Sequence, residues 1–290
     1  MLGNKKQMSA GDNSINVQGE SITINTGISY ADAKEIALQT FKDNFYKLSE
    51  AAQRTAMERA DLLVTTFLEK LQSGTPENIN KILDPDVQYA LVNAQKQYAR
   101  NGSELTLELL TNLLEERFRI DEGSLKKIVL NESIEVIAKL TTDQVRVIAG
   151  IFLVKYSVSS SARYLIETLS PVLDDNFENI KNDFSFFEHL LFTGVASNDI
   201  STQSSQNLEY FIRKSYEGEI TYKIDGTNMK LDPVVRSQFE IDTLSKNVFE
   251  RWNSSLISRY SLTSVGKAVA VAYYNSMKGA KADLDMWIKN

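Results

Sequence analysis

The sequence contains no cysteine and a single histidine, and these absences exclude several kinds of site. Without thiols the chain has no disulfide, no iron–sulfur cluster, no thiolate nucleophile and no zinc site built on cysteine. One histidine cannot supply a paired-histidine metal motif. A chain without cysteine suits a reducing compartment, so we expect a cytoplasmic protein.

Long hydrophobic runs are also missing. The longest uncharged aliphatic run is Val147–Val154, which is far shorter than the roughly 20 apolar residues that cross a bilayer. The polar segment Met1–Asn13 lacks the apolar core of a secretory signal. Glycine-rich phosphate loops of the P-loop or dinucleotide type do not occur. We therefore expect no membrane span, no export signal and no cofactor.

Acidic residues outnumber basic ones, with 38 Asp/Glu against 32 Lys/Arg and a net charge of −6. Residues 203–290 are the exception, with 12 Lys/Arg and 10 Asp/Glu. Proteins bind nucleic acids largely by neutralising phosphates with cationic side chains. The charge balance therefore argues against a general nucleic-acid-binding role and leaves only a local basic surface in the C-terminal third.

The most unusual feature of the sequence is a tandem repeat near the N-terminus. The heptad Ser14–Glu20 is followed directly by the similar heptad Ser21–Gly27. Aliphatic and polar side chains alternate in both, which is typical of short strands with one apolar face. The aliphatic residues of the repeat are Ile15, Val17, Ile22 and Ile24.

The repeat is too small to fold alone. Burying its aliphatic side chains gains at most roughly 6–12 kcal/mol, whereas ordering the segment costs about 1–2 kcal/mol per residue. Residues 14–27 therefore pair with copies from other chains, dock on the rest of the protein, or have no fixed structure. The tandem match favours a homo-oligomer, because identical strands present identical edges.

From Ser29 the hydrophobic period changes from two to about 3.6 residues. No glycine or proline interrupts this pattern before Gly74. Ser29 can cap the first turn, and Gly74 supplies a stop. We predict one helix over residues 29–74, which would reach about 65 Å and serve as a stalk or as a long core helix.

Residues 75–196 are predicted to form a helical core domain. Its helices are expected at about 77–83, 86–100, 104–119, 123–139 and 142–157. A Ser/Asn/Gln-rich stretch, 197–206, then indicates a linker to a C-terminal module at residues 207–290. The expected fold class is mainly α, a multi-helix orthogonal bundle with one very long N-terminal helix. A short β-repeat segment at residues 1–28 and one C-terminal β-hairpin complete the expected architecture.

The hairpin is predicted in the C-terminal module, where Asp225-Gly226 separates two stretches of alternating residues, 219–224 and 227–231. A helix, a hairpin and a helix in this order resemble a winged helix. An alternative function is therefore a winged-helix-like nucleic-acid-binding protein. The candidate contacts to nucleic acid or to a partner are Arg213, Lys214, Lys223 and Lys230.

Catalytic residues are not evident. His189 lies in an aromatic stretch, and a structural histidine is favoured there, with a hydrolase that uses His189 as general base as a second alternative. The carboxylate pairs Glu115/Glu116 and Asp283/Asp285 are expected on solvated faces, because a catalytic dyad needs burial and convergence. The sequence therefore favours a protein without catalytic, cofactor-binding or metal-ligating residues.

Two passages resemble known families. Gly11–Gln18, with the sequence GDNSINVQ, and the helical segment Phe41–Leu48 resemble the start of an uncharacterised bacterial family of about this length. Leaders of this form are similar to those on bacterial conflict and phage-defence proteins, and Tyr260–Gly266 resembles the end of some abortive-infection-like proteins. The resemblance implies a bacterial protein with an antiviral defence role, but no activity or catalytic residue.

These observations predict a non-enzymatic, homo-oligomeric interaction or scaffold protein that acts as a sensor or effector in phage defence. Its partners would be other copies of the chain, joined through residues 14–27, and a protein partner or trigger that the sequence does not identify.

Overall fold

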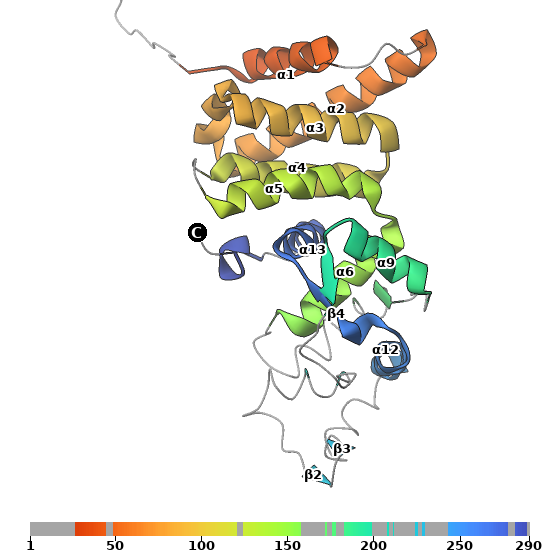
Figure 1. The fold of residues 1–290 in the computed structure, drawn as a ribbon. Helices are drawn as coiled ribbons and strands as arrows, with labels where there is room; N and C mark the ends of the chain where they lie inside the picture. The colour runs from red at the N-terminus through yellow and green to blue at the C-terminus, as the bar shows by residue number, and fades with distance from the viewer. Residues whose placement is uncertain are drawn as a thin grey trace, which may run out of the picture.

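The computed structural model of the protein is mainly helical, as predicted (Figure 1). The described residues are 27–44, 49–120, 124–157, 172, 176–177, 183–198, 208, 211, 224–225, 228–229, 243–277 and 282–288. The predicted β-repeat lies outside the described residues, except for Gly27. The orthogonal arrangement of the bundle stays a prediction.

The helices and 3₁₀ helices are α1 (Tyr30–Asn44), α2 (Glu50–Gly74), η1 (Pro76–Leu83), α3 (Pro85–Asn101), α4 (Glu104–Arg119), α5 (Leu125–Val136), η2 (Ile137–Lys139), α6 (Thr142–Lys155), α9 (Phe184–Phe192), α12 (Thr243–Ser254), η4 (Ile257–Arg259), α13 (Ser264–Ser276) and η5 (Leu284–Met286). The strands are β1 (Ala196–Asn198), β2 (Ile224–Asp225), β3 (Asn228–Met229) and β4 (Tyr260–Leu262). The helices predicted between residues 76 and 157 are present, with ends that differ by no more than two residues if 3₁₀ turns are included. The first of them, η1, is a 3₁₀ helix, and the helix predicted over 123–139 is α5 continued by the 3₁₀ helix η2.

Polar side chains and one glycine fix where several helices begin and end. At the start of α1, Ser29 Oγ accepts a hydrogen bond from the Asp32 N–H, and the Asp32 carboxylate accepts one from the Ser29 N–H. Thr141 and Gln144 form the same reciprocal arrangement, a capping box, at the start of α6. α3 ends at Asn101 and is followed by the cap residue Gly102, whose φ of 69° is a left-handed conformation that favours glycine.

The prediction of a single helix over residues 29–74 is wrong. The structure has two helices, α1 and α2, that pack against each other, so the chain reverses between them (Figure 1). α1 buries its own stripe of Ala33, Ala37 and Phe41, and Ser49 precedes α2 in the N-cap position. Because the apolar period is similar in both helices, periodicity alone does not reveal the reversal.

One large hydrophobic core joins the described helices. α2, α3 and α4 pack on one another, α5 packs on α3 and α4, and α13 packs against α4, α5 and α6. Figure 1 shows these helices as successive layers, from α1 through α2 and α3, then α4 and α5, to α13, α6 and α9. α13 belongs to the predicted C-terminal module, yet it shares a core with the helices of the predicted domain at residues 75–196.

A short antiparallel pair, β1 with β4, brings distant parts of the chain together, with Ala196 opposite Leu262. Gly266, in the first turn of α13, lies so close to this pair that a Cβ atom there would be 2.0 Å from the Val195 carbonyl oxygen. Glycine at position 266 therefore permits the close packing of α13 beside β1.

The predicted C-terminal hairpin is present as β2 and β3, with Ile224 opposite Met229 and Asp225 opposite Asn228. The last pair closes the hairpin one residue later than the Asp225-Gly226 turn that the sequence predicts.

Candidate ligand pocket

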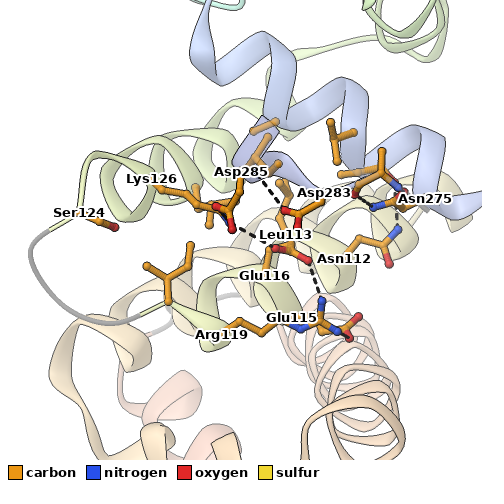
Figure 2. Close-up of a pocket in the computed structure, with 17 residues that line it drawn as sticks. Asn112, Leu113, Glu115, Glu116, Arg119, Ser124, Lys126, Asn275, Asp283 and Asp285 are labelled. Atoms are coloured by element: carbon orange, nitrogen blue, oxygen red, sulfur yellow. Dashed lines mark hydrogen bonds and ion pairs between the residues drawn. The ribbon is translucent and has the colours of Figure 1, made fainter. Parts of the chain in front are cut away.

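A pocket of about 640 Å³ lies between α4, the start of α5, α13 and the C-terminal segment 282–288, which contains η5 (Figure 2). Volumes of this order are typical of small-molecule sites. The ionisable side chains that line it are Glu115, Glu116, Arg119, Lys126, Asp283 and Asp285.

Helical spacing brings the side chains of the pocket to the same place. On α4, Asn112, Glu116 and Arg119 follow one another at intervals of four and three residues, so they share one face. On α13, Ala268 and Ala272 are also four residues apart and face the pocket. Their small side chains leave room between α13 and α4.

Lys126 lies between two carboxylates. Its Nζ is 2.5 Å from Asp285 Oδ1 and 3.8 Å from Glu116 Oε2. The Lys126 side chain is only 7% exposed, so these two carboxylates offset the free-energy cost of burying its positive charge. The second cation, Arg119, contacts Glu116 at 3.0 Å and Glu115 at 2.5 Å. The ion pairs therefore connect α4, α5 and the C-terminal segment.

Burial raises the pKa of Glu116 above its ordinary value. Its side chain is 22% exposed. Arg119 and Lys126 lower this pKa, and Glu115 and Asp283 raise it, but burial has the largest effect. The cations of the pocket thus compensate the negative charge of Glu116 only in part.

The C-terminal segment forms one wall of the pocket and is held in place by several contacts. Asn275 donates a hydrogen bond to the Ala282 carbonyl oxygen and accepts one from the Ala282 N–H, at 2.9 and 2.7 Å. Leu284 is buried, and Trp287 Nε1 donates to the Tyr156 carbonyl oxygen at 2.8 Å. Leu284 and Trp287 therefore anchor this wall to the core.

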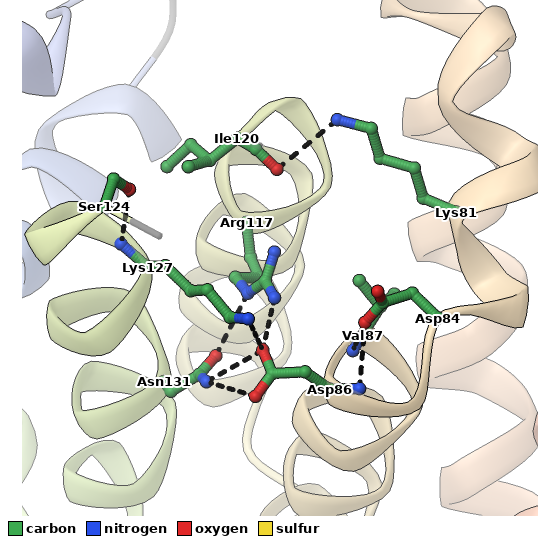
Figure 3. A network of polar contacts seen from close by, with 9 residues as sticks. All are labelled: Lys81, Asp84, Asp86, Val87, Arg117, Ile120, Ser124, Lys127 and Asn131. Carbon is green, nitrogen blue, oxygen red and sulfur yellow. Dashed lines mark hydrogen bonds and ion pairs between the residues drawn. The ribbon is translucent and has the colours of Figure 1, made fainter. Parts of the chain in front are cut away.

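A second polar network lies at Arg117, on α4 (Figure 3). The Arg117 side chain is 2% exposed; it forms an ion pair with Asp86 of α3, and its Nε donates to Asn131 of α5 at 3.2 Å. Burial raises the pKa of Asp86, but hydrogen bonds from Arg117 and Asn131 and the charges of Arg117 and Lys127 outweigh it, so the pKa lies below its ordinary value. This network ties α3, α4 and α5 together.

The structure gives His189 contacts of a structural kind. Its Nδ1 lies 3.0 Å from the side-chain amide of Gln144, the residue that completes the capping box of α6. The same amide donates to the Phe186 carbonyl oxygen at 3.2 Å. His189 thereby helps to join α9 to the start of α6.

The pocket brings together carboxylates that the sequence places on solvated faces. That expectation is wrong for Glu115 and Glu116, whose side chains are 21% and 22% exposed, whereas Asp283 and Asp285 are exposed. The contact between Lys126 and Asp285 joins positions 159 residues apart, so no local pattern could indicate it.

Two sets of predicted site residues lie outside the described residues and stay predictions. The predicted assembly residues are Ile15, Val17, Ile22 and Ile24, and the predicted contact residues are Arg213, Lys214, Lys223 and Lys230. Among the residues that the structure describes, no helix is both long and apolar enough to cross a membrane. Within the same residues, no three His, Asp or Glu side chains are grouped as a metal site requires.

Fold and pocket together define a mainly helical protein with a polar pocket at the edge of one large core. Residues 27–231 and 224–288 match the model of an uncharacterised protein family, and the chain belongs to that family. The match begins at residue 27 and so leaves out nearly all of the tandem repeat. No curated protein and no solved structure matches the chain.

Proposed function

We propose that the protein is a non-enzymatic, homo-oligomeric interaction protein that assembles through residues 14–27. The observation that carries this proposal is the tandem heptad, in which aliphatic and polar residues alternate. The repeat is too short to be stable alone, so copies from several chains supply the apolar partners that it lacks.

The helical body would then present a surface for a ligand or partner. Its pocket lies where α4, α5, α13 and the C-terminal segment meet, so a bound molecule would contact four parts of the fold. Binding there can favour one arrangement of these parts over another if the molecule binds the two arrangements with different affinity.

Light scattering on the intact protein tests the assembly. Ile22→Asp combined with Ile24→Asp places charges on the apolar face of the second heptad and should give monomers. Thr23→Asp combined with Asn25→Asp adds the same charge to the opposite face and should leave the oligomer intact, because alternate side chains of a strand point to opposite sides. A monomeric wild type, or equal effects of the two double variants, would overturn the proposal.

The leader sequence GDNSINVQ extends the proposal to a sensor or effector in bacterial phage defence. Cells that carry the gene should form fewer plaques on phage challenge than cells that lack it. Protection should be lost with Ile22→Asp and Ile24→Asp and kept with the matched control. Equal plaque numbers with and without the gene would remove the defence role and leave the assembly proposal to be judged by light scattering.

A further inference from the structure

Several lysines that are at least partly buried in this fold hold their ammonium groups against oxygen atoms. Lys34 Nζ lies 2.8 Å from Asp61 Oδ1. Lys155 Nζ donates hydrogen bonds to the carbonyl oxygens of Ser258 and Tyr260, at 2.9 and 2.6 Å. Such oxygen atoms stabilise the protonated form of the amine, which is not nucleophilic.

Lys267, near the start of α13, has a different environment. It is partly buried, and its Nζ lies 4.5 Å from the centroid of the Tyr156 ring. Within the part of the chain that the structure describes, this Nζ has no carboxylate at ion-pair distance and no hydrogen-bond acceptor. The Lys267 amine therefore loses part of its hydration without gaining an anionic partner.

Burial lowers the pKa of Lys267 below its ordinary value. The attraction between its ammonium and the Tyr156 ring opposes this effect, but a ring face is a weaker partner for a cation than a hydrogen-bonded carboxylate. The hydrogen bond to Asp61, in contrast, raises the pKa of Lys34. At neutral pH Lys267 therefore has the larger unprotonated fraction, and the unprotonated amine is the nucleophile.

We propose that Lys267 is a modification site that accepts an activated acyl group from an acyl phosphate. The nitrogen lone pair attacks the carbonyl carbon and a C–N bond forms. The bond between that carbon and the phosphate oxygen breaks, and phosphate leaves with the electron pair. The nitrogen releases one proton to solvent, no group is oxidised or reduced, and the product is a neutral amide.

Acylation would change the contacts where α6, β4 and α13 meet. The Tyr156 hydroxyl accepts a hydrogen bond from the Leu262 N–H at 2.9 Å, and the Tyr156 carbonyl oxygen accepts one from Trp287 Nε1 at 2.8 Å. Acylation of Lys267 removes the positive charge that the Tyr156 ring attracts. The reaction does not involve residues 14–27, so this proposal and the proposed assembly can fail separately.

Acetylation of the full-length protein with acetyl phosphate at neutral pH, followed by mass spectrometry, measures the rate at each lysine. Lys267 should react at least about threefold faster than Lys139, which is exposed on η2, because more of its amine is unprotonated. Lys34, whose ammonium is paired with Asp61, should react more slowly than Lys139. A rate at Lys267 no higher than the rate at Lys34 or Lys139 would overturn the proposal.

Ser264→Asp places a carboxylate three residues before Lys267, on the same side of α13. An acidic residue is favourable in the first turn of a helix, so this variant should fold. The new ion pair should slow the acetylation of Lys267 about threefold, because it stabilises the ammonium.

The matched control is Thr142→Asp, which adds the same charge in the first turn of α6, at the opposite end of that helix from Tyr156. The control should change the rate at Lys267 less than about twofold, because exposed charges are well screened. Circular dichroism verifies that each variant is folded. Equal effects of Ser264→Asp and Thr142→Asp would overturn the proposal. If Ser264→Asp does not fold, the comparison of Lys267 with Lys34 and Lys139 in the wild type decides the case.

Discussion

Arg117 is buried, and its contacts with Asp86 and Asn131 offset the free-energy cost of burying its positive charge. We expect Asp86→Asn to lower the free energy of unfolding by about 2 kcal/mol at neutral pH. The loss should be smaller than for a fully buried ion pair, because Asp86 is 35% exposed and partly screened by water. Urea unfolding measures this loss, and Glu132→Gln, at an exposed site, should change stability by less than about 0.5 kcal/mol.

The effect of Asp86→Asn should depend on pH. The pKa of Asp86 lies below its ordinary value, so the ionised carboxylate stabilises the folded state above about pH 4. That contribution is lost as the pH falls through the lowered pKa. The difference between wild type and variant should therefore shrink in acid, and a constant difference down to the acid-unfolding limit would contradict the role given to Asp86.

Glu116 makes the opposite contribution. Because burial raises its pKa, the folded state holds this proton more tightly than the unfolded chain, and the ionised form lowers stability at neutral pH. We expect Glu116→Gln to be at least as stable as wild type at neutral pH, with any gain vanishing as the pH falls below about 4.3. A loss above about 1 kcal/mol at neutral pH would mean that the ion pairs of Glu116 outweigh its burial.

Individual pocket residues could be recognised in the sequence, but their proximity in the folded protein could not be predicted from it. Glu115 and Glu116 are visible as a carboxylate pair, whereas the partners of this region come from α13 and from the C-terminal segment. Asn112 donates to the Ala272 carbonyl oxygen 160 positions later. Such pairings are set by the packing of helices, which hydrophobic period and capping patterns do not encode.

At the scale of an element, the start of α13 is fixed by a close backbone approach. Replacing glycine by alanine inside a helix ordinarily gains about 1 kcal/mol. Gly266→Ala should instead lower the free energy of unfolding by about 1–3 kcal/mol, because the added Cβ would clash with the Val195 carbonyl oxygen. Thermal and urea unfolding measure the change.

The control for this prediction is Gly74→Ala, at the end of α2. There the nearest atom to an added Cβ is the end of the flexible Glu115 side chain, at 2.9 Å, and this atom can move aside. Gly74→Ala should leave the free energy of unfolding nearly unchanged. Equal losses in both variants would mean that the approach of Val195 to Gly266 carries no special cost.

The helices between residues 76 and 157 could be predicted because each has its own start and stop residues. Asp84 accepts hydrogen bonds from the Asp86 and Val87 N–H groups at the start of α3, and Gly102 ends that helix. Between α1 and α2 the signal is weaker. Ser49 makes no side-chain cap hydrogen bond. The sequence therefore marks the start of α2 only by a serine within an unbroken apolar pattern.

At the scale of the whole molecule, the two tryptophans report on distant parts of the core. Trp252 of α12 lies 5.9 Å from Phe177, and Trp287 lies 4.7 Å from Phe152, between ring centroids. Because all four belong to one hydrophobic cluster or pack against it, we expect one cooperative unfolding transition. In Trp287→Phe and in Trp252→Phe, the fluorescence of the remaining tryptophan and far-UV circular dichroism should give the same urea midpoint. Separate midpoints would instead support two independent domains divided at residues 197–206.

The position of α13 also bears on how the chain is made. Its partners α4, α5 and α6 all precede it in the sequence, and a nascent chain emerges from the ribosome with its N-terminal part first. Until residues 264–276 are synthesised, the apolar faces that α13 covers have no native partner. Products of premature termination would keep these faces exposed to chaperones and proteases. Only chains translated past residue 276 can therefore cover these apolar faces with α13, and incomplete chains cannot.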